Sequence, residues 1–208
     1  MLGLLLPLLV TMIIGALLAG SLAGLQRVRV TWWPLAVASI AVQLVLFSPP
    51  LDRQPWALAW GQWIWVLSLV GMLAVLIRNG LRHQPARHAW RLAAAGVAAN
   101  LLVVVANGGY MPQSPEARLA ARGIPLAFEG APVELRNVAP SGPDTRLVWL
   151  GDIIAQPGWL PAANVVSVGD LTLSIALAWW AFQTTAVRND LRNVPHLLRR
   201  RLARVPIS

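Results

Sequence analysis

The sequence predicts an all-α membrane protein with five transmembrane helices and a small mixed α/β cap, outside the cytoplasm, between the fourth and fifth helices. Two features predict this fold. Of the 208 residues, 57% are hydrophobic and only 12% are charged, which is outside the range of ordinary soluble domains. The apolar residues gather in five runs, whereas half of the 16 prolines lie between residues 108 and 166, where they prevent a long helix.

The five apolar runs have about the length that a membrane span needs. A hydrocarbon core about 30 Å thick takes roughly 20 residues of helix. We expect spans at about residues 3–25, 30–48, 60–77, 92–107 and 168–187. No basic residue precedes the first run, so we interpret it as a retained helix rather than a cleaved signal peptide. Gly20 and Gly24 within it form a small-residue face, which favours packing within the chain over packing against a second copy.

The basic residues predict the orientation. All 17 are arginine, and the formal net charge is +9. If the helices alternate in direction, twelve arginines fall on one side, at positions 27, 29, 78, 82, 87, 91, 188, 192, 199, 200, 201 and 204. Because loops rich in basic residues stay in the cytoplasm, we expect the N-terminus outside and the C-terminal tail inside. The arginines of the tail are expected to contact anionic lipid heads.

The cap is expected to contain a short helix and a hairpin. The segment from Ser114 to Gly123 begins with an N-cap residue, a proline and an acidic residue and ends in glycine, which predicts a two-turn helix. Apolar residues at 133–138 and 147–149 flank a ProSerGlyProAsp turn and predict a hairpin. The chain then divides into a four-helix membrane region (1–107), the cap (108–166), a fifth transmembrane helix (167–188) and a basic cytoplasmic tail (189–208).

Three polar motifs border the cap, and the first is AsnGlyGlyTyrMetPro at 107–112. Asn107, Gly108 and Gly109 can supply a left-handed helix end, and Pro112 prevents the helix from continuing. The alternative is a ligand-binding role, in which the glycines let a ligand approach the backbone closely.

The other two motifs carry acidic residues: LeuGlyAspIleIle at 150–154 contains Asp152, and AsnValValSerValGlyAsp at 164–170 ends in Asp170. Ser167 and Asp170 have the spacing of a capping box, so Asp170 can be a structural cap of its helix. An ionisable residue near the hydrocarbon boundary is also a functional candidate. We name Asn164 and Ser167, together with residues 107–109, as candidate ligand-binding residues.

Asp152 and Asp170 raise a catalytic hypothesis. If the cap brings them together, one carboxylate could act as base and the other as acid to activate water, as in an aspartic hydrolase. Residues 147–177 locally resemble lipoprotein signal peptidase, whose late aspartates flank an outer segment in a similar way. The chain lacks that family's Phe-Asn-x-Ala-Asp run, because Asn164 stands six residues before Asp170, and it also lacks the upstream Gly-Asn-x-x-Asp-Arg run.

A wider resemblance covers nearly the whole chain. The early apolar helices, followed by AsnGlyGlyTyrMetPro, LeuGlyAspIleIle and SerValGlyAsp in that order, resemble an uncharacterised family of bacterial multi-pass membrane proteins, a domain of unknown function. The chain departs from it at 155–156, where AlaGln replaces a more proline-like continuation. The resemblance implies a shared fold and a place in the bacterial inner membrane, and it brings no activity.

Several chemistries have no candidates in this sequence. There is no cysteine, and the three histidines, His83, His88 and His196, lie outside the spans, so we expect neither a metal nor a cofactor. Asn100, inside the fourth span, is expected to make an interhelical hydrogen bond. The spans hold few other polar residues and the chain shows no internal repeat, which places a small transporter third among the functions. No nucleic-acid motif accompanies the arginines.

The leading functional hypothesis is therefore a non-enzymatic membrane protein whose outer cap binds a ligand or a membrane-protein partner. The aspartate hydrolase is the alternative.

Overall fold

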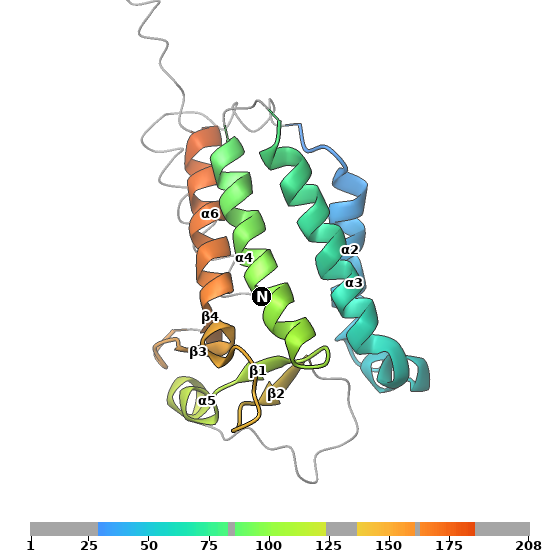
Figure 1. Cartoon of the computed structure of the whole chain (residues 1–208), viewed down its shortest axis with the longest axis vertical. Helices are drawn as coiled ribbons and strands as arrows, with labels where there is room; N and C mark the ends of the chain where they lie inside the picture. Colours follow the sequence, from blue (N-terminus) through green and yellow to red (C-terminus); the bar gives the residue numbers. More distant parts are fainter. Residues whose placement is uncertain (1–28, 83–85, 124–136, 161–162, 186–208) are drawn as a thin grey trace, which may run out of the picture.

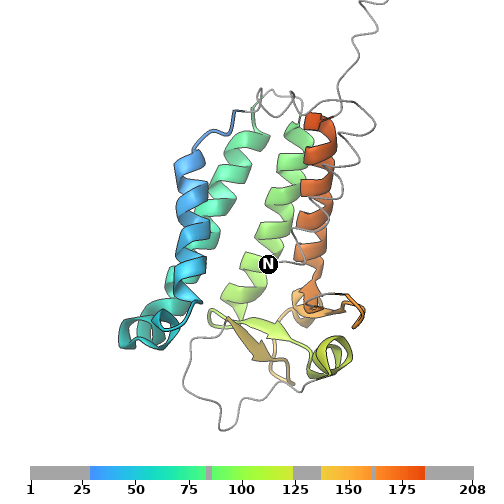
Figure 2. The same cartoon turned by 180° about the vertical axis from the view of Figure 1, so that it is seen from behind.

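The computed structural model describes residues 29–82, 86–123, 137–160 and 163–185, which form a mostly helical structure with a small mixed sheet. Four helices lie side by side in one layer: α2 (Trp33–Leu46), α3 (Pro55–Gly80), α4 (Arg87–Ala106) and α6 (Val168–Thr185) (Figure 1). α2 packs on α3, and α4 packs between α3 and α6. Consecutive helices of this layer run in opposite directions, as expected for consecutive membrane spans (Figures 1 and 2).

Within the helix layer, α4 buries mainly small side chains, and α3 exposes large apolar side chains on its outer side. In α4 the buried residues are Ala89, Ala93, Ala94, Gly96, Val97, Val103 and Val104. The outer side of α3 exposes Trp56, Trp60, Trp63, Leu67, Val70 and Ile77, spaced three or four residues apart until a gap of seven before Ile77. A spacing of three or four places residues on one face of a helix. Small residues let helix backbones approach closely.

Two of the described helices, α3 and α4, are long and apolar enough to cross a membrane. The prediction of five spans is therefore not supported. α2 has only 14 residues, about 21 Å at 1.5 Å per residue, because it starts after a left-handed Trp32 and ends at Leu46. α6 has 18 residues but includes Asp170 and Gln183, which lower its hydropathy. The first expected span, residues 3–25, and the basic tail lie outside the described residues.

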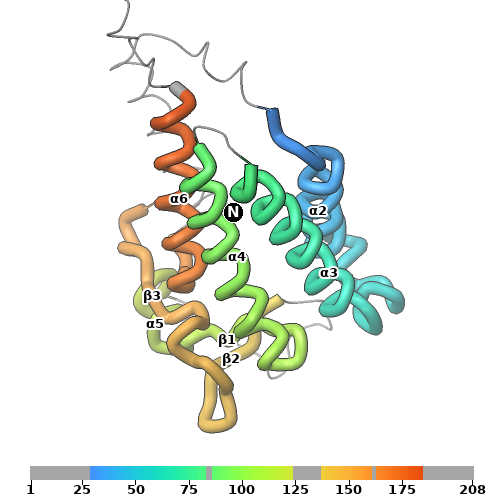
Figure 3. The backbone as a smooth tube through the Cα atoms, turned by 45° about the horizontal axis from the view of Figure 1, so that its top comes forward, coloured from blue at the N-terminus to red at the C-terminus, as the bar shows by residue number. Residues whose placement is uncertain are grey.

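A four-stranded sheet forms between α4 and α6 in the sequence and lies at one end of the helix layer. Its strands are β1 (Met111–Gln113), β2 (Val138–Pro140), β3 (Asp152–Ala155) and β4 (Val165–Ser167), in the order β2-β1-β3-β4. β1 is parallel to both of its neighbours, and β3 and β4 are antiparallel. Figure 3 shows the sheet and α5 (Pro115–Arg122) next to the ends of α4 and α6. This small mixed cap confirms the α/β prediction for the segment.

The short helix of the cap is as predicted, whereas the hairpin prediction is wrong. Ser114 Oγ accepts a hydrogen bond from Ala117 N at 3.0 Å, and Gly123 ends α5 with φ +65°. Residues 148–150 form a 3-10 helix, η3 (Val148–Leu150), and β2 pairs instead with β1. Residues 133–136 of the predicted hairpin lie outside the described residues.

The end of the helix layer opposite the cap is held by a polar side chain that the sequence analysis did not single out. Asn79, fully buried near the end of α3, accepts a hydrogen bond from Thr31 N at 2.9 Å and donates to Thr31 O at 3.0 Å. The guanidinium of Arg78 lies 5.8 Å from the centre of the Trp32 ring, a cation–π contact. These contacts hold the left-handed Trp32 at the start of α2.

Candidate functional site

The three polar motifs meet at the junction of the cap with α4 and α6. The sheet register pairs Gln113 of β1 with Asp152 of β3, and Asp152 with Ser167 of β4. These three side chains therefore follow one another across three strands. Asn100 of α4 and Asp170 of α6 complete the group through hydrogen bonds. We call these five residues, Asn100, Gln113, Asp152, Ser167 and Asp170, the junction cluster.

Ser167 and Asp170 form the predicted capping box at the start of α6. Asp170 N donates to Ser167 Oγ at 2.9 Å, and Ser167 N donates to Asp170 Oδ2 at 3.3 Å. Asn100 links this box to α4, because its Nδ2 donates to Asp170 Oδ1 at 2.7 Å and its Oδ1 accepts from Ser167 Oγ at 2.8 Å. The interhelical bond expected for Asn100 is thus confirmed, and both carboxylate oxygens of Asp170 accept hydrogen bonds.

Glycines allow the two helices to meet at this point. A Cβ atom on Gly96 of α4 would lie 2.7 Å from Gly169 O, and one on Gly169 would lie 2.7 Å from Gly96 O. In the neighbouring LeuGlyAspIleIle motif, a Cβ atom on Gly151 would lie 2.5 Å from Pro112 O. These distances are too short for any side chain, so the glycines of two motifs have a packing reason.

Asp152 and Gln113 form the more buried and less hydrogen-bonded half of the cluster. Asp152 is 7% exposed and Gln113 is 1% exposed. Gln113 Nε2 donates to Asp152 Oδ2 at 3.3 Å, while Asp152 Oδ1 and Gln113 Oε1 have no hydrogen-bond partner among the described residues. The pKa of Asp152 is raised from 3.8 to about 7, mainly by burial and also by the negative charge of Asp170, while the hydrogen bond from Gln113 lowers it.

The two carboxyl groups of the cluster therefore differ in their environment. Asp170 lies in the first turn of α6, and both of its carboxylate oxygens accept hydrogen bonds. Asp152 is buried with one long hydrogen bond, which favours its neutral, protonated form. A buried carboxyl group that holds its proton beside a second carboxyl group is a candidate for acid–base chemistry. Within the described ranges, no three His, Cys, Asp or Glu side chains are grouped so that they could hold a metal ion.

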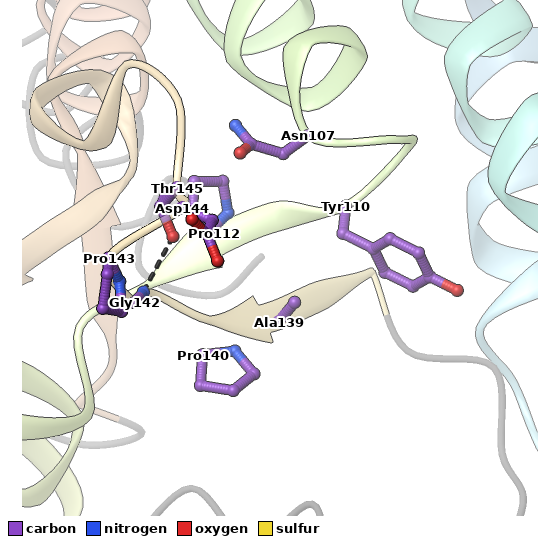
Figure 4. A pocket seen from close by; sticks show the side chains of 9 residues that line it. All are labelled: Asn107, Tyr110, Pro112, Ala139, Pro140, Gly142, Pro143, Asp144 and Thr145. Atoms are coloured by element: carbon purple, nitrogen blue, oxygen red, sulfur yellow. Dashed lines mark hydrogen bonds between the residues drawn. The ribbon is translucent and has the colours of Figure 1, made fainter.

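A second feature of the cap is an open pocket of about 310 Å³ beside the first motif (Figure 4). Its lining residues come from the end of α4, β1, β2 and the following turn: Asn107, Tyr110, Pro112, Ala139, Pro140, Gly142, Pro143, Asp144 and Thr145. Asn107 holds that turn in place, because it accepts from Arg146 N at 2.9 Å and donates to Arg146 O at 2.8 Å. Gly142 N donates to Thr145 Oγ1 at 2.8 Å within the turn.

The glycines of the first motif make the predicted left-handed helix end. Gly108 and Gly109 have φ angles of +69° and +94°, whereas Asn107, at φ −112°, is not left-handed. A Cβ atom on Gly109 would lie 2.8 Å from the Cβ of Gln62, so α3 passes close to this turn. Figure 4 shows the Tyr110 side chain directed away from β1, and its hydroxyl accepts a hydrogen bond from Gln62 Nε2 of α3.

The candidate residues from the sequence thus fall into two groups and one separate position. Asp152, Asp170 and Ser167 come together in the junction cluster. Asn107 lines the pocket, whereas Gly108 and Gly109, which follow it in the sequence, are not among the lining residues. Asn164 lies at the other end of the β3–β4 pair, where its backbone N donates to Gln156 Oε1 at 3.0 Å. No bond in the described part of the chain joins it to the cluster.

The sequence analysis missed Gln113 and Tyr110 as site residues. Gln113 is the residue directly after AsnGlyGlyTyrMetPro, and its burial follows from its place in the sheet between β2 and β3. A glutamine next to a proline in a loop-like segment gives no local signal of burial. Only the pairing of β1 with β3 places it beside Asp152.

Comparison with known proteins agrees with the resemblance deduced from the motifs. Neither the curated proteins nor the solved structures contain a match to the chain. A family model matches residues 27–182, which include all of the described helices except the last three residues of α6, as well as the whole sheet. The chain therefore belongs to DUF5317, a family of unknown function.

Proposed function

We propose that this protein is a multi-pass protein of the bacterial inner membrane whose cap, outside the cytoplasm, binds a small ligand or a partner protein without catalysing a reaction. The observation that carries the binding role is the pocket of about 310 Å³, whose walls are held together by the contacts of Asn107 with Arg146. A preformed concave site of this kind is the usual form of a ligand site.

The membrane location is supported by the surface of the helix layer. α2 and α6 expose large apolar side chains as α3 does, among them Val37 and Ile40 in α2 and Leu171, Ile175 and Phe182 in α6. Soluble proteins rarely expose apolar surface on this scale, whereas lipid-facing helices do. A span shorter than the bilayer, as α2 would be, is accommodated by local thinning of the bilayer.

The orientation is supported by the arginines at the end of α3 and the start of α4. Arg78, Arg82, Arg87 and Arg91 lie at the end of the layer opposite the cap. The positive-inside rule places that end in the cytoplasm. A Ser141→Cys variant of this cysteine-free chain tests it: a membrane-impermeant maleimide should label intact cells. Labelling only after the membrane is opened would reverse the orientation.

Photocrosslinking from the pocket tests the binding role. A photoreactive residue at Ala139, in the pocket wall, should give a discrete adduct in native membranes, identified by mass spectrometry of lipids, small molecules and proteins. The matched control carries the same group at Leu119, which is exposed on α5 and does not line the pocket. The same products from both positions, or none from either, would contradict a pocket ligand.

A second candidate function, an interfacial hydrolase, is favoured by the contrast between Asp152 and Asp170. In that reaction the Asp170 carboxylate takes a proton from water as the water oxygen bonds to a carbonyl carbon. The bond from that carbon to the leaving amine or alcohol then breaks as Asp152 gives its proton to the leaving group. The hydrogen bonds that Asn100 and Ser167 already donate to Asp170 favour the capping role instead. If the wild-type chain hydrolyses ester or peptide substrates, and the Asp152→Asn and Asp170→Asn chains accumulate normally but lose this activity, the hydrolase proposal replaces the binding proposal.

A further inference from the structure

The β3–β4 hairpin, described for residues 152–160 and 163–167, exposes an apolar surface at the edge of the cap. Ile153 and Ile154 are partly exposed on β3. Trp159, in the turn that follows β3, is 80% exposed, the highest value among the large apolar side chains of the described residues. Such side chains are normally covered when they cluster on a surface.

The hairpin also differs from the rest of the cap in its charge. The sequence has no charged residue from 153 to 169, and Asp152, at the start of the hairpin, is buried. The other described parts of the cap carry Glu116, Arg118 and Arg122 on α5 and Asp144 and Arg146 in the turn after β2. One edge of the cap is therefore neutral and apolar, and the remainder is charged.

The apolar surface of the hairpin continues onto the helix layer. β4 ends at Ser167 and α6 begins at Val168, whose exposed side chain opens a row that goes on through Leu171 and Ile175. Trp149 of η3, a segment that packs against both β3 and α6, is 61% exposed. Tryptophan gathers where the hydrocarbon core meets the lipid headgroups, because its ring is apolar and its N–H is polar.

We propose that the β3–β4 hairpin lies in the headgroup region of the phospholipid leaflet nearest the cap, with Trp159 and the isoleucines of β3 in contact with lipid. The proposal rests on the membrane location proposed above and adds a second contact with the bilayer, made by the cap itself. A neutral surface with exposed tryptophan and isoleucine matches this environment, whereas the charged parts of the cap match water.

Three single-cysteine variants of the full chain, each labelled with the polarity-sensitive fluorophore NBD, test the proposal in phosphatidylcholine and phosphatidylglycerol vesicles. Trp159→Cys reports on the hairpin, Ile175→Cys on the outer face of α6, and Ser141→Cys on the charged part of the cap. The quenchers are lipids with a nitroxide near the headgroup, lipids with a nitroxide deep in the acyl chain, and aqueous iodide. Because the chain has no cysteine of its own, each label is at one site.

The expected result is a graded pattern. The headgroup nitroxide should be the strongest quencher of the label at position 159. The deep nitroxide should be the strongest quencher of the label at 175, and iodide of the label at 141. An Ile154→Cys label should repeat the pattern of position 159, which covers the case in which the tryptophan variant does not fold.

Two results would overturn the inference while leaving the membrane location intact. In both, the label at 175 is quenched by lipid. In the first, the label at 159 is quenched by iodide as strongly as the label at 141. In the second, the label at 159 is protected from iodide and from both lipid quenchers, which would show that protein covers the hairpin. If no lipid quenches the label at 175, the membrane location itself is wrong.

Discussion

Asn100 of α4 and Gly169 of α6 are in direct contact: a Cβ atom on Gly169 would lie 2.0 Å from Asn100 Oδ1. The same oxygen accepts the hydrogen bond from Ser167 Oγ, and the same side chain donates to Asp170. The contact is therefore possible only because residue 169 has no side chain. It fixes where the cap joins the helix layer.

Gly169→Ala should destabilise the protein strongly. The added methyl group must displace Asn100 and separate α4 from α6, and overpacking of this kind costs about 1–3 kcal/mol or more. The measurement is the thermal unfolding midpoint in detergent micelles. Gly142→Ala is the matched control, because no atom lies within 4 Å of its Cβ position, and it should leave the midpoint unchanged. Equal midpoints for both variants would contradict the close approach of the helices.

Asp152→Asn should remove a pH dependence of stability. Because the pKa of Asp152 is about 7 in the folded chain and 3.8 is its ordinary value, the folded state binds this proton more tightly. The stabilisation from this bound proton is complete below pH 3.8 and is lost as the pH rises through about 7. The difference between the two pKa values corresponds to roughly 4 kcal/mol of unfolding free energy. The wild-type chain should therefore lose stability across this window, and the variant should lose less and be more stable at pH 7.

Unfolding by urea across a pH series gives this comparison, with the exposed Asp144→Asn as the control. The control should follow the wild-type chain at every pH. If Asp152→Asn also follows the wild-type chain, the carboxyl group of Asp152 does not hold its proton near neutral pH.

The bond between Asn100 and Asp170 should give a measurable coupling energy. Asn100→Ala leaves Asp170 Oδ1 and Ser167 Oγ without these partners, at a cost of about 1–3 kcal/mol. Asp170→Ala removes the Asp170 half of the capping box, at about 1 kcal/mol or more. The double variant should lose less than the sum of the two. The control pair is Asn100→Ala with Thr172→Ala, since the Thr172 hydroxyl donates within α6 to Val168 O. That pair should be additive.

Asn107→Ala should loosen the pocket without unfolding the chain. The substitution removes both hydrogen bonds to Arg146, which lies on the surface, so the loss of stability should be only about 1–2 kcal/mol. Hydrogen exchange of the amides at 145–147 should become faster, while exchange in α5 should stay the same. Unchanged exchange at 145–147 would mean that Asn107 does not hold the turn.

Local sequence signals predicted the parts of the fold that depend on local hydrogen bonds. The helix from Ser114 to Gly123 and the capping box of Ser167 and Asp170 involve atoms only a few residues apart, so their residue types identify them. The left-handed glycines at 108 and 109 are of the same kind.

Features that depend on pairing between distant segments were not predictable in this way. The alternation of apolar residues before β2 indicates a strand but does not name its partner, and the nearest apolar run, residues 147–149, was the wrong choice. The burial of Gln113 depends on the same long-range pairing. Hydropathy also marked an apolar run without marking where α2 begins, which is directly after the left-handed Trp32.

Ser167 ends β4 and Val168 begins α6, so no loop separates the edge of the sheet from the helix. The direction of the first turn of α6 therefore follows directly from the end of β4. Further along α6, the Trp179 ring stacks on His88 of α4 with a centroid separation of 6.4 Å. α6 is thus joined to α4 at two levels, by Asn100 next to the cap and by His88 towards the opposite end of the layer.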